Sequence, residues 1–161
     1  RHDFLILRGN EIATDQGDML VFGFDEDVKE IIRLDELREK VLKDGGFIIA
    51  AHPFRGFLTF GIGQLGLTPE KAMERPLFQH VDAVEVLNSK VSERENRFSS
   101  QVAVGLGLPG TGGSDAHEVE EVGIYATRFP GRVTNEKELV AALKGGNYTP
   151  VAFSAETGVK E

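Results

Sequence analysis

Phe47-Ile48-Ile49-Ala50-Ala51-His52-Pro53 is the stretch of this sequence that decides the fold. A short apolar run that follows two glycines and stops at a proline predicts a strand buried on both faces, as in parallel sheets. Pro53 cannot continue a β-ladder, so the strand must end near His52. Because that end of a strand faces the ligand site in parallel α/β folds, we expect His52 to point a ring nitrogen into a pocket. The alternative is a histidine satisfied by a nearby backbone carbonyl.

On both sides of this strand, short apolar runs alternate with helical patterns, which indicates an α/β fold with a mostly parallel sheet. Asp15-Gln16-Gly17 predicts one hairpin turn, and Asp44-Gly45-Gly46 ends the first helix, because glycine adopts the left-handed cap at little cost. With no repeat and no long linker, residues 1–161 are expected to form a single domain. The predicted strands are Phe4–Leu7, Met19–Phe24, Phe47–Ala51, Ala83–Leu87, Leu108–Gly112 and Gly123–Thr127; the predicted helices are Asp27–Lys43, Thr68–Glu74, Ser92–Leu106 and Asn135–Lys144, the last capped by Thr134.

Gly112-Gly113-Ser114-Asp115-Ala116-His117 contains the strongest candidate metal ligands. Asp115 and His117 are two residues apart, so in extended backbone they project to the same side, where a carboxylate and an imidazole can bind one divalent ion. The glycines let the chain turn tightly beside a ligand. An ordinary helix N-cap in front of residues 118–121 is the alternative.

Three more candidates lie at or just beyond predicted strand ends. Glu11 is a candidate metal ligand whose carboxylate could bridge two ions, or a solvated loop residue. Arg55 is a candidate for holding a substrate phosphate through a bidentate contact, or an exposed arginine without such a role. Asn88 is expected either to orient a substrate or a water molecule, or to cap a loop. Arg55 and Asn88 are therefore the candidate catalytic residues.

The composition limits the chemistry further. The chain has no cysteine, which excludes disulfides and thiolate ligands and suits a reducing, cytoplasmic compartment. Imidazole and carboxylate ligands suit zinc, manganese, iron or magnesium. A net charge of −8 disfavours strong non-specific nucleic-acid binding. No apolar run approaches the roughly 20 residues that cross a bilayer, so no membrane partner is expected.

Gly61-Ile62-Gly63-Gln64-Leu65-Gly66 matches Gly-x-Gly-x-x-Gly, and Glu85 follows about 20 residues later, as in dinucleotide-binding sites. The context is poor, because Thr68-Pro69 begins a helix only after the third glycine, which should lie inside it. We therefore favour a loop beside the His52 site over a nicotinamide-nucleotide site.

Several of these segments, in this order, resemble the PHP (polymerase and histidinol phosphatase) superfamily of metal-dependent phosphoesterases. They are Gly-Asn-Glu-Ile around Glu11, Ala-His-Pro-Phe-Arg around His52, the run from Asp82 to Asn88, and Gly-Ser-Asp-Ala-His ending at His117, which is the most specific. Residues 136–150 also look like the family's last helix and its exit.

The resemblance implies a distorted (β/α)7-type barrel of mostly parallel strands, with two or three divalent metal ions at the strand C-termini. Glu11 would bridge two ions, His52 would bind one of them and Asp115 the other, and His117 would bind a third or complete the cluster. The implied activity is hydrolysis of a small phosphorylated substrate, such as a nucleotide or a short oligonucleotide. A non-catalytic regulatory or interaction module of the same fold is the alternative.

The sequence also departs from the family pattern. The opening His-x-His motif and the Thr-Asp-His motif, which supply several ligands, have no match here, and Arg1-His2-Asp3 does not replace them. We expect the chain to correspond to the C-terminal two-thirds of a PHP domain, with the first strands supplied by an upstream segment or a second chain. Alone, it is expected to be poorly active.

Overall fold

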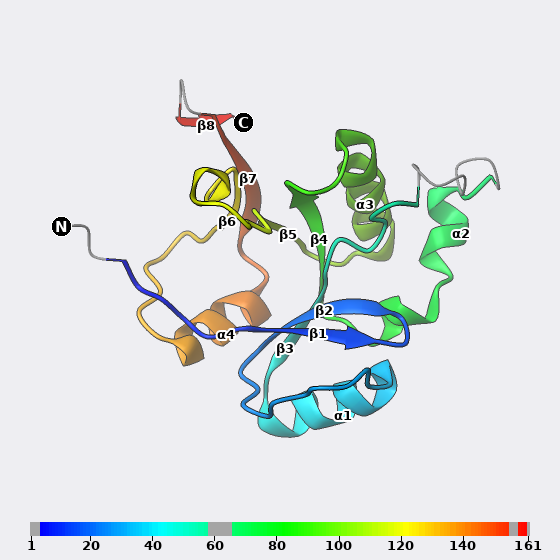
Figure 1. The fold of residues 1–161 in the computed structure, drawn as a ribbon, viewed down its shortest axis with the longest axis horizontal. Helices are drawn as coiled ribbons and strands as arrows, with labels where there is room; N and C mark the ends of the chain where they lie inside the picture. The colour runs from blue at the N-terminus through cyan, green and yellow to red at the C-terminus, as the bar shows by residue number, and fades with distance from the viewer. Residues whose placement is uncertain (1–3, 58–65, 155–157, 161) are drawn as a thin grey trace.

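The computed structural model describes residues 4–57, 66–154 and 158–160 (Figure 1). The helices are α1 (Leu34–Asp44), α2 (Pro69–Met73), α3 (Glu93–Leu106) and α4 (Glu136–Gly145), with 3-10 turns η2 (Pro76–Gln79) and η3 (Val119–Glu121). The strands are β1 (Asn10–Thr14), β2 (Gly17–Phe22), β3 (Phe47–Ala50), β4 (Ala83–Asn88), β5 (Gly110–Gly113), β6 (Tyr125–Arg128), β7 (Thr149–Ser154) and β8 (Gly158–Lys160).

The main sheet has five strands in the order β1-β2-β3-β4-β5. The β1–β2 and β2–β3 pairs are antiparallel, whereas β3–β4 and β4–β5 are parallel. Strands β6, β7 and β8 form a second, antiparallel sheet. The predicted (β/α)7-type barrel of mostly parallel strands is therefore wrong: the described residues form an open mixed sheet with β1 and β5 at its edges, and no closed barrel.

The hairpin between β1 and β2 is the physical reason for this difference. The predicted turn at Asp15 and Gln16 is confirmed, since Thr14 pairs with Gly17 across it. The Thr14 hydroxyl donates to the Gly17 carbonyl over 2.6 Å and accepts from the Gln16 N–H over 3.1 Å, which fixes the reversal. So short a turn can join only antiparallel strands, because a parallel pair needs a crossover of a dozen or more residues.

Strand β3 is buried on both faces, as its apolar run predicts. Ile48 and Ala50 pack in one core with residues of α1, α2 and α3, while Phe47 and Ile49 pack in a second core against α4. Helices therefore cover both faces of the sheet around β3, and the strand's end is held rigidly between two layers.

The first strand lies later in the chain than predicted. Phe4–Leu7 forms no strand, and Phe4 and Ile6 are 82% and 91% exposed. β1 instead buries Ile12 and Thr14 on alternate positions, and its ladder with β2 sets its limits.

The starts of two helices also differ from the prediction, and two strands near the C-terminal end were missed. α1 begins at Leu34 rather than Asp27. Asn135, not Thr134, caps α4, because its side chain accepts from the Glu138 N–H over 3.0 Å. β7 and β8 were not predicted.

Among the described helices, none combines the length and the apolar character that crossing a bilayer requires. Most of the glycine-rich segment, residues 61–65, lies outside the described residues. The predicted helix start at Thr68-Pro69 is confirmed, since the Thr68 side chain caps α2 by accepting from the Lys71 N–H.

Candidate metal centre

Glu11 and Asp18 come together through the register of the β1–β2 hairpin. Ala13 pairs with Asp18, and Glu11 pairs with Leu20. Paired residues and residues two apart in a strand share a face, so Glu11 and Asp18 are diagonal neighbours on one face of the hairpin. Two carboxylates are thereby placed beside the end of β3.

His52 reaches these carboxylates because the chain turns sharply after β3. Its φ is +28°, which is rare for a residue other than glycine. The backbone N–H of His52 donates to Glu85 Oε2 over 2.8 Å, and this contact holds the turn. The ring is directed towards β1, with Nε2 lying 3.4 Å from Glu11 Oε1 and only 8% of the side chain exposed.

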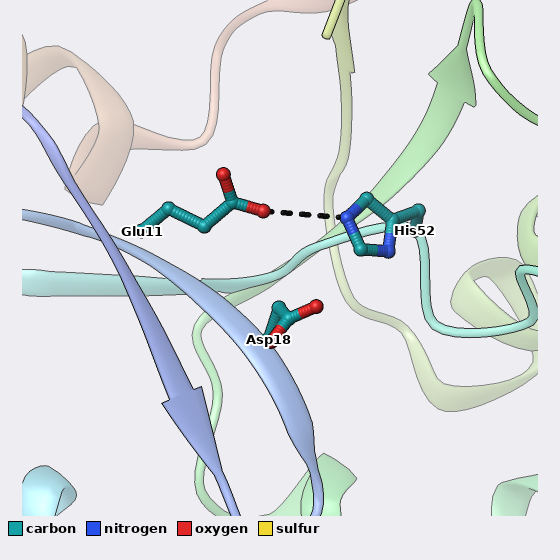
Figure 2. Close-up of side chains that lie close together, drawn as sticks. All are labelled: Glu11, Asp18 and His52. Carbon is teal, nitrogen blue, oxygen red and sulfur yellow. Dashed lines mark hydrogen bonds and ion pairs between the residues drawn. The ribbon is translucent and has the colours of Figure 1, made fainter. Parts of the chain in front are cut away.

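The ligand atoms of Glu11, Asp18 and His52 all lie within 4.8 Å of one another. Figure 2 shows the two carboxylates and the imidazole converging from neighbouring strands. Two atoms bound to one ion lie no more than about 4.4 Å apart, because each bond is about 2.0–2.2 Å long. Movements of a few tenths of an ångström, which the exposed Glu11 side chain permits, would let all three bind one divalent ion. One imidazole and two carboxylates suit zinc, manganese or iron.

Asp115 belongs to a second polar group, with Arg55 and Asn88. Its φ is +47°, so both predicted ligands that follow strands have strained backbones. Asp115 Oδ2 accepts from Arg55 Nη1 over 3.3 Å and from Asn88 Nδ2 over 3.4 Å. The preceding Ser114 fixes this loop, since its hydroxyl donates to the Tyr125 carbonyl over 3.0 Å.

Glu85 joins these two groups. It is buried on β4, and its Oε2 accepts from the His52 N–H and, over 3.0 Å, from Asn88 Nδ2. Burial raises the pKa of the Glu85 carboxyl, and the hydrogen bonds from His52 and Asn88 oppose that rise. With its oxygen committed in this way, Glu85 does not offer the free carboxylate that a dinucleotide ribose would require.

Asn88 has little capacity left for a ligand. Its amide N–H groups point to Glu85 and Asp115, and its Oδ1 accepts from the Lys90 N–H over 2.8 Å. This geometry matches the loop-capping alternative and positions Asp115 as well.

His117 lies beside Asp115 but away from the other ligands. Its Nδ1 is 2.9 Å from the Asp115 carbonyl, which can only accept, so Nδ1 carries the proton and Nε2 of a neutral ring keeps a free lone pair. The side chain is 67% exposed. The His117 N–H donates to Glu121, whose carboxylate also pairs with Lys90. These contacts hold the pKa of Glu121 near 2.

The structure thus brings Glu11 and His52 together and connects Asp115 to them through Glu85 and Asn88. Among the described residues, the three-ligand group that it forms contains Asp18, which the sequence interpretation missed, and not Asp115 or His117. The signal for Asp18 was the hairpin turn, which places it diagonally opposite Glu11 once β1 is located correctly.

A cavity of about 250 Å³ opens beside this centre. Its walls include Asp18 and His52 together with two guanidinium groups, Arg55 and Arg75. The centre therefore combines carboxylates for a cation with arginines suited to an anion.

Comparison with known proteins matches one segment of the chain to a family model. Residues 93–148 match the family model described as PHP-associated, which relates this segment of the chain to PHP proteins. The matched segment includes Asp115 and His117 but not Glu11, Asp18 or His52.

Two of the similar proteins illustrate the likeness. The uncharacterized protein MJ0417 of Methanocaldococcus jannaschii is 30% identical over 127 residues, which cover 75% of this chain and 50% of that protein. The crystal structure of PsfC from Pseudomonas syringae superimposes with a TM-score of 0.64 at 21% identity, over 93% of this chain and 60% of that chain. The second likeness shows the fold alone. This chain spans about half the length of the curated relative that it matches.

Proposed function

We propose that this PHP-related chain forms part of a metal-dependent phosphoesterase that hydrolyses a small phosphorylated substrate, with Glu11, Asp18 and His52 holding a divalent ion. The observation that carries the proposal is the convergence of these three ligand atoms within 4.8 Å beside a cavity lined by arginines. A divalent ion bound there would supply Lewis-acid stabilisation of a phosphoryl group and lower the pKa of a bound water.

The chain's own residues perform the remaining tasks. Glu85 accepts from the His52 backbone N–H and so supports the turn that directs the imidazole towards Glu11. Such support by residues behind the ligands commonly determines metal affinity. Glu11 is the exposed member, with 53% of its side chain accessible, and its rotation would adjust the site to the ion.

Asp115 and His117 are the proposed ligands of a further ion. In the structure, Arg55 Nη1 forms an ion pair with Asp115 Oδ2 at 3.3 Å. An ion bound by Asp115 would displace that guanidinium, which would then be free to hold a phosphate oxygen. Asn88 would keep the Asp115 carboxylate in place during this exchange.

The test is a titration of the protein with Mn²⁺ or Zn²⁺ by calorimetry, followed by assay of p-nitrophenyl phosphate hydrolysis. Asp18→Asn keeps the size of the side chain but removes its charge, and we expect it to weaken binding of the first ion at least about tenfold. Asp27→Asn is the matched control, because Asp27 is exposed and pairs only with Lys29 among the described residues.

Equal metal affinity in the wild type and Asp18→Asn would show that the three-ligand site is wrong. Metal binding without hydrolysis, measured on the longer protein if this chain is part of one, would favour the non-catalytic module instead.

A further inference from the structure

Arg75 follows α2, and its side chain is held against two aromatic rings. Its Cζ lies 5.1 Å from the ring centroid of Phe57 and 5.8 Å from that of Phe54. The two rings meet edge to face, with centroids 5.8 Å apart. Nη1 donates to the Pro53 carbonyl over 3.2 Å. Stacking and this hydrogen bond fix the plane of the guanidinium.

This guanidinium has no acidic partner among the described residues. No carboxylate oxygen of those residues lies within 4.0 Å of it, in contrast to Arg38, which pairs with Asp82 at 2.7 Å. The glycine-rich stretch at 58–65 contains no Asp or Glu. Burial lowers the pKa of Arg75, and no acid among the described residues raises it again. A partly buried charge without a counterion costs free energy, and in proteins such a charge is normally paired.

Arg75 lines the cavity that also contains Asp18, His52 and Arg55. Of the two arginines in the cavity wall, Arg55 is paired with Asp115, whereas Arg75 has no ion-pair partner within the described part of the chain. A planar guanidinium with a fixed plane suits an oxyanion that can accept two parallel hydrogen bonds.

We propose that Arg75 binds a phosphate group of the ligand in this cavity, next to the Glu11–Asp18–His52 centre. The phosphate would supply the missing counterion. The inference rests on the proposed function for the identity of the molecule that carries the phosphate, but not for the anion site itself.

The experiment uses the chelator-treated protein, so that neither a metal nor hydrolysis is involved. Inorganic phosphate is titrated into ¹⁵N-labelled protein, and the Nε–Hε signal of Arg75 is followed by NMR. We expect a saturable shift of that signal, and acetate at the same concentration should shift it less. Because the wild-type signal is the readout, this part needs no variant.

Variants then identify the residue responsible. Arg75→Gln should weaken phosphate binding at least about tenfold, the change expected when one charge-assisted contact is lost. Arg75→Lys should retain part of the affinity, because it keeps the charge but not the planar fork. Arg97→Gln is the matched control, since Arg97 is exposed on α3 and should not affect phosphate binding.

An unshifted Arg75 signal, or equal phosphate affinity in Arg75→Gln and the wild type, overturns the inference. Neither result touches the proposed function, which depends on the Asp18→Asn metal titration. Conversely, a protein that binds phosphate through Arg75 but binds no metal would refute the proposed function and leave this inference standing.

Discussion

Glu85 accepts the backbone N–H of His52 over 2.8 Å, and this hydrogen bond joins the buried centre of β4 to the turn that carries the candidate metal ligand. The His52 backbone at this turn has φ +28°. A conformation of that kind persists only when its surroundings hold it. Glu85 is therefore a positioning residue for His52, and its removal should lower the metal affinity of the centre.

Glu85→Ala should lower both stability and metal affinity. The His52 N–H and an Asn88 amide N–H would lose their acceptor, which costs about 1–3 kcal/mol of unfolding free energy. Metal affinity should fall about 10- to 100-fold, as for other residues that orient a ligand. Urea unfolding of the metal-free protein and a Mn²⁺ titration measure the two effects.

Two further variants calibrate that experiment. Glu85→Gln keeps a carbonyl oxygen for the His52 N–H and should lose less stability and less metal affinity than Glu85→Ala. Glu74→Ala removes an exposed glutamate and should change neither. An Ala variant with full metal affinity would mean that the Glu85 contact does not position His52.

Gly112 is closely packed where β5 meets the second sheet. A Cβ built there would lie 2.7 Å from the Ala126 backbone carbonyl, which cannot move aside as a flexible side chain would. We expect Gly112→Ala to destabilise the protein by about 1–3 kcal/mol. The matched substitution Gly145→Ala meets nothing within 4 Å at the end of α4 and should be neutral or slightly stabilising. Equal melting temperatures for the two variants would contradict this packing.

The structure could be predicted from the sequence where a local pattern of residues determines it. The run Phe47–Ala51 has apolar residues on both faces, so its burial and the position of His52 at its end follow from the run itself. Gly45 likewise ends α1 with φ +73°, as predicted, because few other residues adopt that conformation cheaply.

The structure could not be predicted from the sequence where pairing between strands determines it. The apolar residues Phe4–Leu7 lie outside the sheet, with Phe4 and Ile6 exposed, whereas the more polar β1 is selected by its ladder with β2. Asp18 was missed for the same reason, because its proximity to Glu11 depends on that register. The barrel came from the family resemblance and not from any pattern in these residues, and the antiparallel hairpin excludes it here.

The core under α1 offers a paired test of the hydrophobic face. Leu37 is fully buried, while Leu42 on the same helix is 57% exposed. Leu37→Ala should cost about 2–5 kcal/mol of unfolding free energy, since it leaves a cavity in the core. Leu42→Ala should change stability by no more than about 0.5 kcal/mol. Chemical denaturation gives both values. Similar losses of unfolding free energy in the two variants would mean that the buried face of α1 is assigned incorrectly.

Tyr148 should give the protein a specific loss of stability at high pH. Its ring packs with Phe129, at a centroid distance of 5.5 Å, and its hydroxyl finds no hydrogen-bond partner among the described residues. Burial, and then repulsion by Asp82, raise the pKa of Tyr148 to about 12. An unfolded tyrosine loses its proton near about pH 10. Unfolding therefore releases a proton between these values, and the stability that is fully present below pH 10 falls as the pH rises through 12.

Tyr148→Phe should remove this fall and, by deleting an unpaired hydroxyl, raise the unfolding free energy at neutral pH by about 1 kcal/mol. Urea unfolding of both proteins at about pH 7, 9 and 11 measures the difference. A phenylalanine variant that is less stable at neutral pH would mean that the hydroxyl has a bonding partner after all.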